Sequence, residues 1–211
     1  MIATRIGWLA LALAASGWGF LWFAISHANV FCGGGPDDCP SLLGEAPRYV
    51  AVFGMVVSAT AISVALDRVR VAPRFMSAGA IVLSSVGLVL ALAMTLAGYD
   101  YMLSSIGSGR LDTPQRDPAL PVVVRSVGAL WPLFIGGWMT LASLQLVRIG
   151  LPFAIAALGV ITGFAIVVTL PYSAEWFVYT SILPLELICS LVWATAVGVY
   201  FTTPRRIAAP A

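Results

Sequence analysis

The sequence contains no lysine, only one histidine and few charged residues of any kind. All eleven basic residues are arginines, nine residues are acidic, and charged residues make up 9% of the 211 residues. A soluble domain typically carries about 25% charged residues, which keep its surface hydrated. A chain of this composition lacks the polar groups to cover a surface of its own size. The sequence therefore predicts that hydrocarbon, rather than water, surrounds most of the chain.

These absences exclude several classes of function. Without lysine there is no retinal Schiff base and no Walker phosphate-binding loop. His27 alone does not supply the two imidazoles of a bis-histidine haem, and no Gly-x-Ser-x-Gly elbow accompanies it. The net charge is only +2, without a dense basic patch, which argues against nucleic acid as a partner. We expect no cofactor, no nucleotide and no nucleic-acid ligand, and the sequence does not favour an enzyme.

Apolar residues make up 60% of the sequence and form long runs. A membrane-spanning helix needs about 20 mostly apolar residues, and continuous rather than alternating runs favour helices over a barrel. We therefore predict an all-α fold, a single transmembrane bundle over residues 1–211. The six predicted spans cover residues 6–25, 49–66, 75–97, 122–147, 151–170 and 179–201. The predicted outer loops cover residues 26–48, 98–121 and 171–178.

The arginines give the predicted orientation of the spans. Seven arginines and one aspartate would lie on the side of both termini, against four arginines and seven acidic residues on the opposite side. Basic residues are in excess in cytoplasmic loops, so both termini are predicted to be cytoplasmic. The first run is longer than the 7–15 apolar residues typical of a secretory signal, which favours an uncleaved span. The predicted location is the cell membrane, and the arginine- and alanine-rich composition is typical of a GC-rich bacterium.

Two cysteines, Cys32 and Cys39, lie in the first predicted outer loop. On the oxidising side of a membrane, so closely spaced a pair favours a structural disulfide. One alternative is a metal site that adds His27, Asp37 and Asp38; these residue types suit zinc or copper, although their spacing matches no zinc pattern. A second alternative is a redox pair that exchanges disulfides.

The sixth predicted span contains Glu186, an ionisable residue well inside an apolar run. Such a carboxylate should face the bundle interior and find a partner, and Arg125 near the outer end of span four is the nearest cation by predicted depth. The pair either joins the two spans as a structural ion pair or forms a polar site for a proton or substrate. Pro184 and Pro132 interrupt the same two spans, either as kinks or as the broken helices of a central site.

Gly159 and Gly163 lie one helical turn apart in span five, a spacing that lets helix backbones approach closely. We expect them to pack helices within the monomer; homodimerisation is the alternative. Five polar side chains inside the spans are expected to hydrogen-bond between helices: Ser84, Ser85, Thr140, Ser143 and Gln145.

These observations favour a small transporter or permease-like protein with a polar site between spans four and six. One alternative is an accessory subunit or sensor of a larger membrane complex, with other membrane-protein subunits as partners beside the lipid bilayer. A third is a membrane enzyme that acts on a lipid or quinone.

Overall fold

The structure is a computed structural model that describes residues 1–27, 42–70, 72–107, 130–168 and 185–203. Within these residues the chain forms six α-helices and no β-strand, which confirms the predicted all-α class. The helices are α1 (Ile2–His27), α2 (Leu42–Val69), α3 (Arg74–Gly107), α5 (Trp131–Arg148), α6 (Phe153–Val168) and α8 (Leu185–Thr202).

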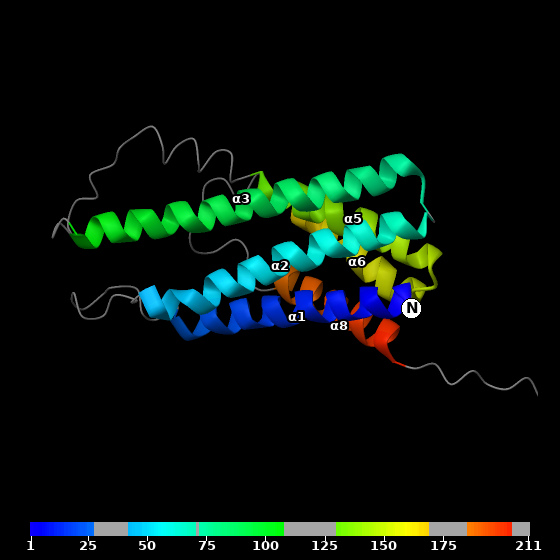
Figure 1. The fold of residues 1–211 in the computed structure, drawn as a ribbon, viewed down its shortest axis with the longest axis horizontal. Coiled ribbons are helices and arrows are strands. Elements are labelled where there is room, and N and C mark those ends of the chain that lie inside the picture. Colours follow the sequence, from blue (N-terminus) through cyan, green and yellow to red (C-terminus); the bar gives the residue numbers. More distant parts are fainter. Residues whose placement is uncertain (28–41, 71, 108–129, 169–184, 204–211) are drawn as a thin grey trace, which may run out of the picture.

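The six helices form a closed ring in which neighbours run in opposite directions (Figure 1). Each described helix packs against the next one along the chain, and α8 completes the ring by packing against α1. α2 and α5 also touch across the ring. The core lies inside this ring, where Ile62 of α2, Met139 of α5 and Trp193 of α8 are each 1% exposed.

The N-terminus and the C-terminal end of α8 lie at the same end of the bundle (Figure 1). The end of α2, the start of α3 and the turn between α5 and α6 lie there as well. We call this the arginine end. Within residues 1–22, 50–70, 72–90, 133–168 and 185–203, the exposed charged side chains belong to the parts of the helices and turns that lie there: Arg5, Asp67, Arg68, Arg70, Arg74 and Arg148.

Away from the arginine end, the outer surface of the described helices is apolar. Within residues 1–22, 50–70, 72–90, 133–168 and 185–203, every exposed residue away from that end is Ala, Val, Leu, Ile, Phe, Trp or Gly. Phe53 of α2, Val82 of α3 and Phe164 of α6 are each more than half exposed, at 62%, 57% and 67%. A surface helix of a soluble protein instead has one apolar stripe and a polar opposite face.

Two of the described helical segments, Val50–Val69 and Leu185–Thr202, are long and apolar enough to cross a membrane. Three further segments are apolar but shorter: Arg74–Leu90, Leu133–Arg148 and Phe153–Val168. The number of spans and their orientation therefore stay predictions at this point.

Two helices extend beyond the predicted spans, into residues that we assigned to the outer loops. α2 begins at Leu42 and α3 continues to Gly107, so residues 42–48 and 98–107 are helical. We placed helix ends where the apolar runs stop, at charged residues such as Arg48 and Asp100. Charged residues end an apolar run, but their helix propensity is within the ordinary range, so a helix can continue through them.

The turn between α5 and α6 follows from its own sequence. Gly150 has a φ of 100°, a left-handed conformation that favours glycine just after a helix. The N–H of Gly150 donates to the carbonyl of Val147, and the N–H of Leu151 donates to the carbonyl of Leu146, both at 3.0 Å. This is the Schellman pattern, which satisfies the last carbonyls of a helix. Tyr200 of α8 donates its hydroxyl to the Gly150 carbonyl at 2.7 Å, so the turn is also held by α8.

α5 and α6 approach each other closely at glycines. A Cβ added to Gly163 of α6 would lie 2.6 Å from the carbonyl oxygen of Gly136 and 3.0 Å from the backbone nitrogen of Thr140, both on α5. A Cβ added to Gly136 would in turn meet the carbonyl of Gly163. One helical turn away, Gly159 lies against the side chain of Ser143. The structure thus places Gly159 and Gly163 at a contact within the monomer, where only glycine leaves room for the facing backbone.

α8 closes the ring against α1 in a similar way. A Cβ added to Gly7 of α1 would lie 2.9 Å from the carbonyl carbon of Phe201 on α8. Farther along the same contact, Trp18 Nε1 donates to Thr195 Oγ1 at 3.3 Å. Close backbone approach and a side-chain hydrogen bond therefore join the first and last described helices.

We expect Gly163→Ala to destabilise the bundle, because the added methyl group would press on backbone atoms of α5. Overpacking of this kind typically costs about 1–3 kcal/mol, so the Tm of thermal unfolding should fall by about 2–10 °C. Gly19→Ala is the matched control, since a Cβ at Gly19 meets nothing within 4 Å, and its Tm should stay level or rise slightly because alanine has the higher helix propensity. Equal Tm values for the two variants would contradict the close α5–α6 contact.

Candidate functional site

Of the predicted Glu186–Arg125 pair, the structure describes Glu186. Glu186 is half-buried in the first turn of α8. Ser190 Oγ donates to the backbone carbonyl of Glu186 at 2.7 Å, a bond within the helix. Arg125 and Pro184 lie outside the described residues, so the pairing of Glu186 with Arg125 stays a prediction.

Pro132 lies at the start of α5 rather than in the middle of a helix. α5 begins at Trp131, and Pro132 occupies its first turn. A proline there deletes no intrahelical hydrogen bond, because the first N–H groups of a helix have no partner within it. The residues of predicted span four that precede Leu130 lie outside the described residues, so a break of that span at Pro132 stays a prediction.

The predicted cysteine site also lies mostly outside the described residues. This holds for Cys32, Asp37, Asp38 and Cys39, while His27 is the last residue of α1. The disulfide and its metal and redox alternatives stay predictions. Within the described ranges, the cysteine present is Cys189, a half-buried free thiol, and no three metal-binding side chains come together.

A chain of three hydrogen-bonded side chains crosses the interior of the bundle. Trp138 Nε1 of α5 donates to Ser63 Oγ of α2 at 2.8 Å, and Ser63 Oγ lies 3.3 Å from Ser84 Oγ of α3. The two serines are fully buried and Trp138 is 4% exposed. Buried polar groups cost free energy unless they are paired. This chain pairs them and fixes three helices relative to one another.

The indole of Trp193 on α8 lies against the indole of Trp138. The two rings meet edge to face, with centroids 6.1 Å apart and planes at 88°. Such a pair contributes about 0.5–1.5 kcal/mol beyond the area that it buries. The contact connects α5 with α8, each of which also packs against α6. Predicted spans four and six thus meet at this tryptophan pair.

Two further polar side chains of α5 are buried inside the bundle. Ser143 is fully buried and Gln145 is 2% exposed. Gln145 lies seven residues, about two helical turns, after Trp138 and so on the same face of α5. Ser143 and the Trp193 indole both lie against Gly159 of α6, which places a hydroxyl and an indole N–H close together.

Four buried polar atoms in this region have no hydrogen-bond partner among the described residues: Ser143 Oγ, Gln145 Nε2, Gln145 Oε1 and Trp193 Nε1. Each unpaired buried group typically costs about 1–3 kcal/mol. We call Ser63, Ser84, Trp138, Ser143, Gln145 and Trp193 together the polar core. Its groups are hydroxyls, an amide and indoles, which bind neutral polar molecules through hydrogen bonds.

Our expectation of hydrogen bonds between helices succeeds only in part. Ser84 Oγ lies 3.3 Å from Ser63 Oγ of another helix, and it also donates to the Ile81 carbonyl of its own helix at 2.9 Å. Thr140 donates its hydroxyl to the Gly136 carbonyl of its own helix at 2.9 Å, a local bond that threonine forms readily. Ser143 and Gln145 are buried without such a bond.

Sequence reasoning missed the tryptophans of the polar core. Trp138 and Trp193 lie well inside predicted spans, whereas tryptophan in membrane proteins is enriched at the interfaces. A buried indole N–H usually finds a hydrogen-bond partner. A tryptophan placed in mid-span was therefore the available signal for an interior polar site.

We expect Ser63→Ala to lower the free energy of unfolding by about 1–3 kcal/mol, because it leaves the buried Nε1 of Trp138 without its acceptor. Ser190→Ala is the control, since the Ser190 hydroxyl bonds only to carbonyls of its own helix and its removal should change stability little. Thermal unfolding of the two variants in parallel measures the difference. A Ser63→Ala protein as stable as Ser190→Ala would show that the interior hydrogen bond contributes nothing.

The geometry of the polar core is the available guide to function. Ser63, Trp138 and Trp193 bring α2, α5 and α8 together around unpaired donors and acceptors. Comparison of the chain with protein-family models, with curated proteins and with solved structures finds no match.

Proposed function

We propose that the chain is a six-span protein of the cell membrane with both termini in the cytoplasm. Its apolar exterior supports this location, because helices that are hydrophobic all round belong in a membrane or inside a larger protein core. The five arginines and one aspartate exposed at the arginine end support the orientation, since basic residues are in excess on the cytoplasmic side.

We further propose that the protein is permease-like and that the polar core binds a small uncharged polar solute. The observation that carries this proposal is the set of four unpaired atoms on Ser143, Gln145 and Trp193. A solute that offers both donors and acceptors would pair with these atoms and remove the cost of leaving them unsatisfied. Serine, glutamine and tryptophan side chains offer such a solute donors and acceptors without a net charge.

The solute path would run from the polar core toward the end of the bundle opposite the arginine end. Glu186 precedes Trp193 by seven residues on α8, which corresponds to about 10 Å along the helix. An intramembrane carboxylate commonly marks a substrate pathway. In this proposal Glu186 and Arg125 line the outer part of the path, and Pro184 lies beside them.

The structure would then represent a closed state. Gly159 already lies against Ser143 and Trp193, so a solute can reach both side chains only when α6 moves away from α5 and α8. Transporters alternate access by moving one part of the bundle against another around the site.

We expect Gln145→Leu to reduce solute permeation by roughly tenfold or more, because the loss of one good hydrogen-bonding group of about 1.4 kcal/mol corresponds to a factor of ten. The same variant should be at least as stable as the original protein, since it removes a buried amide that has no described partner. The measurement is the swelling rate of proteoliposomes in urea or glycerol, together with the Tm.

Ser143→Ala and Ser190→Ala form the matched pair for this assay, because both remove one serine hydroxyl. Ser143→Ala should slow swelling, whereas Ser190→Ala, with its hydroxyl bonded inside α8, should leave it unchanged. If the original protein swells no faster than protein-free vesicles, or if Gln145→Leu has no effect, the proposed solute site is wrong.

A further inference from the structure

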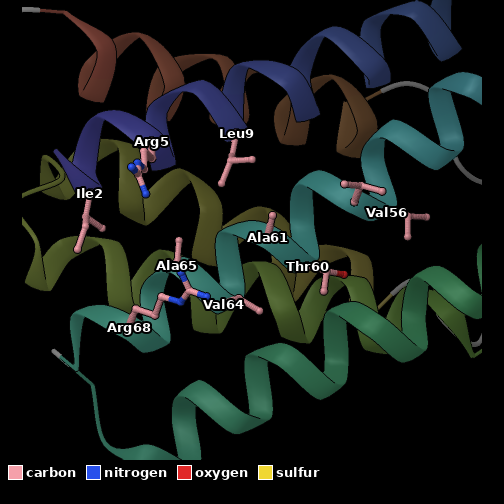
Figure 2. A pocket seen from close by; sticks show the side chains of 10 residues that line it. Ile2, Arg5, Leu9, Val56, Thr60, Ala61, Val64, Ala65 and Arg68 are labelled. Atoms are coloured by element: carbon pink, nitrogen blue, oxygen red, sulfur yellow. The ribbon is translucent and has the colours of Figure 1, made fainter.

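A groove with a volume of about 640 Å³ lies between α1 and α2 on the outer face of the bundle. Apart from Thr60 and two arginines, the side chains that line it are apolar, and several are small, such as Ala61 and Ala65. Figure 2 shows Arg5 of α1 and Arg68 of α2 toward the same end of the groove, on its two sides. The groove therefore combines an apolar channel with a cationic end.

We propose that this groove binds one phospholipid with an anionic headgroup, taken from the leaflet at the arginine end. Arg5 and Arg68 would hold the headgroup phosphate, and one acyl chain would lie along the apolar channel. This proposal depends on the membrane location proposed above, but it does not depend on solute transport.

The length of the groove matches one leaflet. Val57 also lines the groove. It precedes Arg68 by eleven residues on α2, which corresponds to a length of about 17 Å at 1.5 Å per residue. The hydrocarbon core of a bilayer is about 30 Å thick, so one leaflet contributes about 15 Å. An acyl chain whose headgroup is held at Arg68 would therefore follow the groove for the full depth of its leaflet.

The two arginines are suited to a phosphate. A guanidinium group binds phosphate oxygens through two parallel hydrogen bonds, which a single ammonium cannot do. Arg5 lies in the first turn of α1, where the positive end of the helix dipole disfavours a cation. Its position is therefore unfavourable for α1 alone, and an anion shared with Arg68 would compensate for it.

The test is native mass spectrometry of the full chain in detergent, titrated with phosphatidylglycerol or with phosphatidylcholine of the same acyl chains. Two arginines near the headgroup should make phosphatidylglycerol bind about thirtyfold more tightly. Arg5→Gln with Arg68→Gln should remove this preference. Arg74→Gln, which changes an exposed arginine at the same end but outside the groove, should keep it.

Ala61→Phe tests the apolar channel, because the added ring would fill the groove while leaving both arginines in place. It should weaken binding of both lipids at an unchanged Tm. Millimolar inorganic phosphate should not displace phosphatidylglycerol if the acyl chain contributes to binding. Equal binding of the two lipids by the original protein, a preference that survives loss of both arginines, or full displacement by phosphate would each overturn the proposal.

The lipid test and the permeation test fail separately. If phosphatidylglycerol is preferred through Arg5 and Arg68 but Gln145→Leu has no effect on swelling, the lipid site stands and the solute site is wrong. If swelling depends on Gln145 but the two lipids bind equally, the reverse holds.

Discussion

The helices of this bundle carry apolar side chains on their outer faces as well as on their inner faces. This limits which interactions can hold the helices together. Phe53 and Phe164 are exposed on the outside, while Ile62 and Met139 fill the inside. In water, burial of the inner set would supply most of the stability. In the membrane that we propose, burial gains little, because lipid tails are as apolar as these side chains. The helices must then associate through close packing and through hydrogen bonds between helices.

Both kinds of contact converge on α5. One part of α5 meets α6 where Gly136 faces Gly163, and Trp138 reaches Ser63 of α2 and Trp193 of α8. A hydrogen bond between membrane helices contributes about 0.6–2 kcal/mol. The same helix also carries Ser143 and Gln145, whose unpaired atoms reduce stability. α5 thus stabilises the ring and in our proposal holds the solute, so that stability and activity oppose each other at this helix.

The all-α class and the approximate position of each described helix could be predicted, because the length of an apolar run is a local property of the sequence. The starts of α2 and α5 could not, since neither Arg48 nor Pro132 shows whether a helix continues past it. The polar core depends on which helices become neighbours. Trp138 and Ser63 are 75 residues apart in the chain, and no local pattern connects them. Gln145 could be identified as an interior amide, but its lack of a described partner could not.

Spin labels on the outer face test the central claim, that hydrocarbon covers this face, most directly. Single cysteines would replace Phe53, Val82 and Phe164 in a chain whose own cysteines are changed to serine, with Arg70→Cys as the reference at the arginine end. After reconstitution into bilayers, the account predicts that the first three labels collide more often with oxygen than with a water-soluble nickel chelate, and that the reference shows the reverse. More frequent collisions with the chelate at Phe53, Val82 and Phe164 would contradict a membrane location.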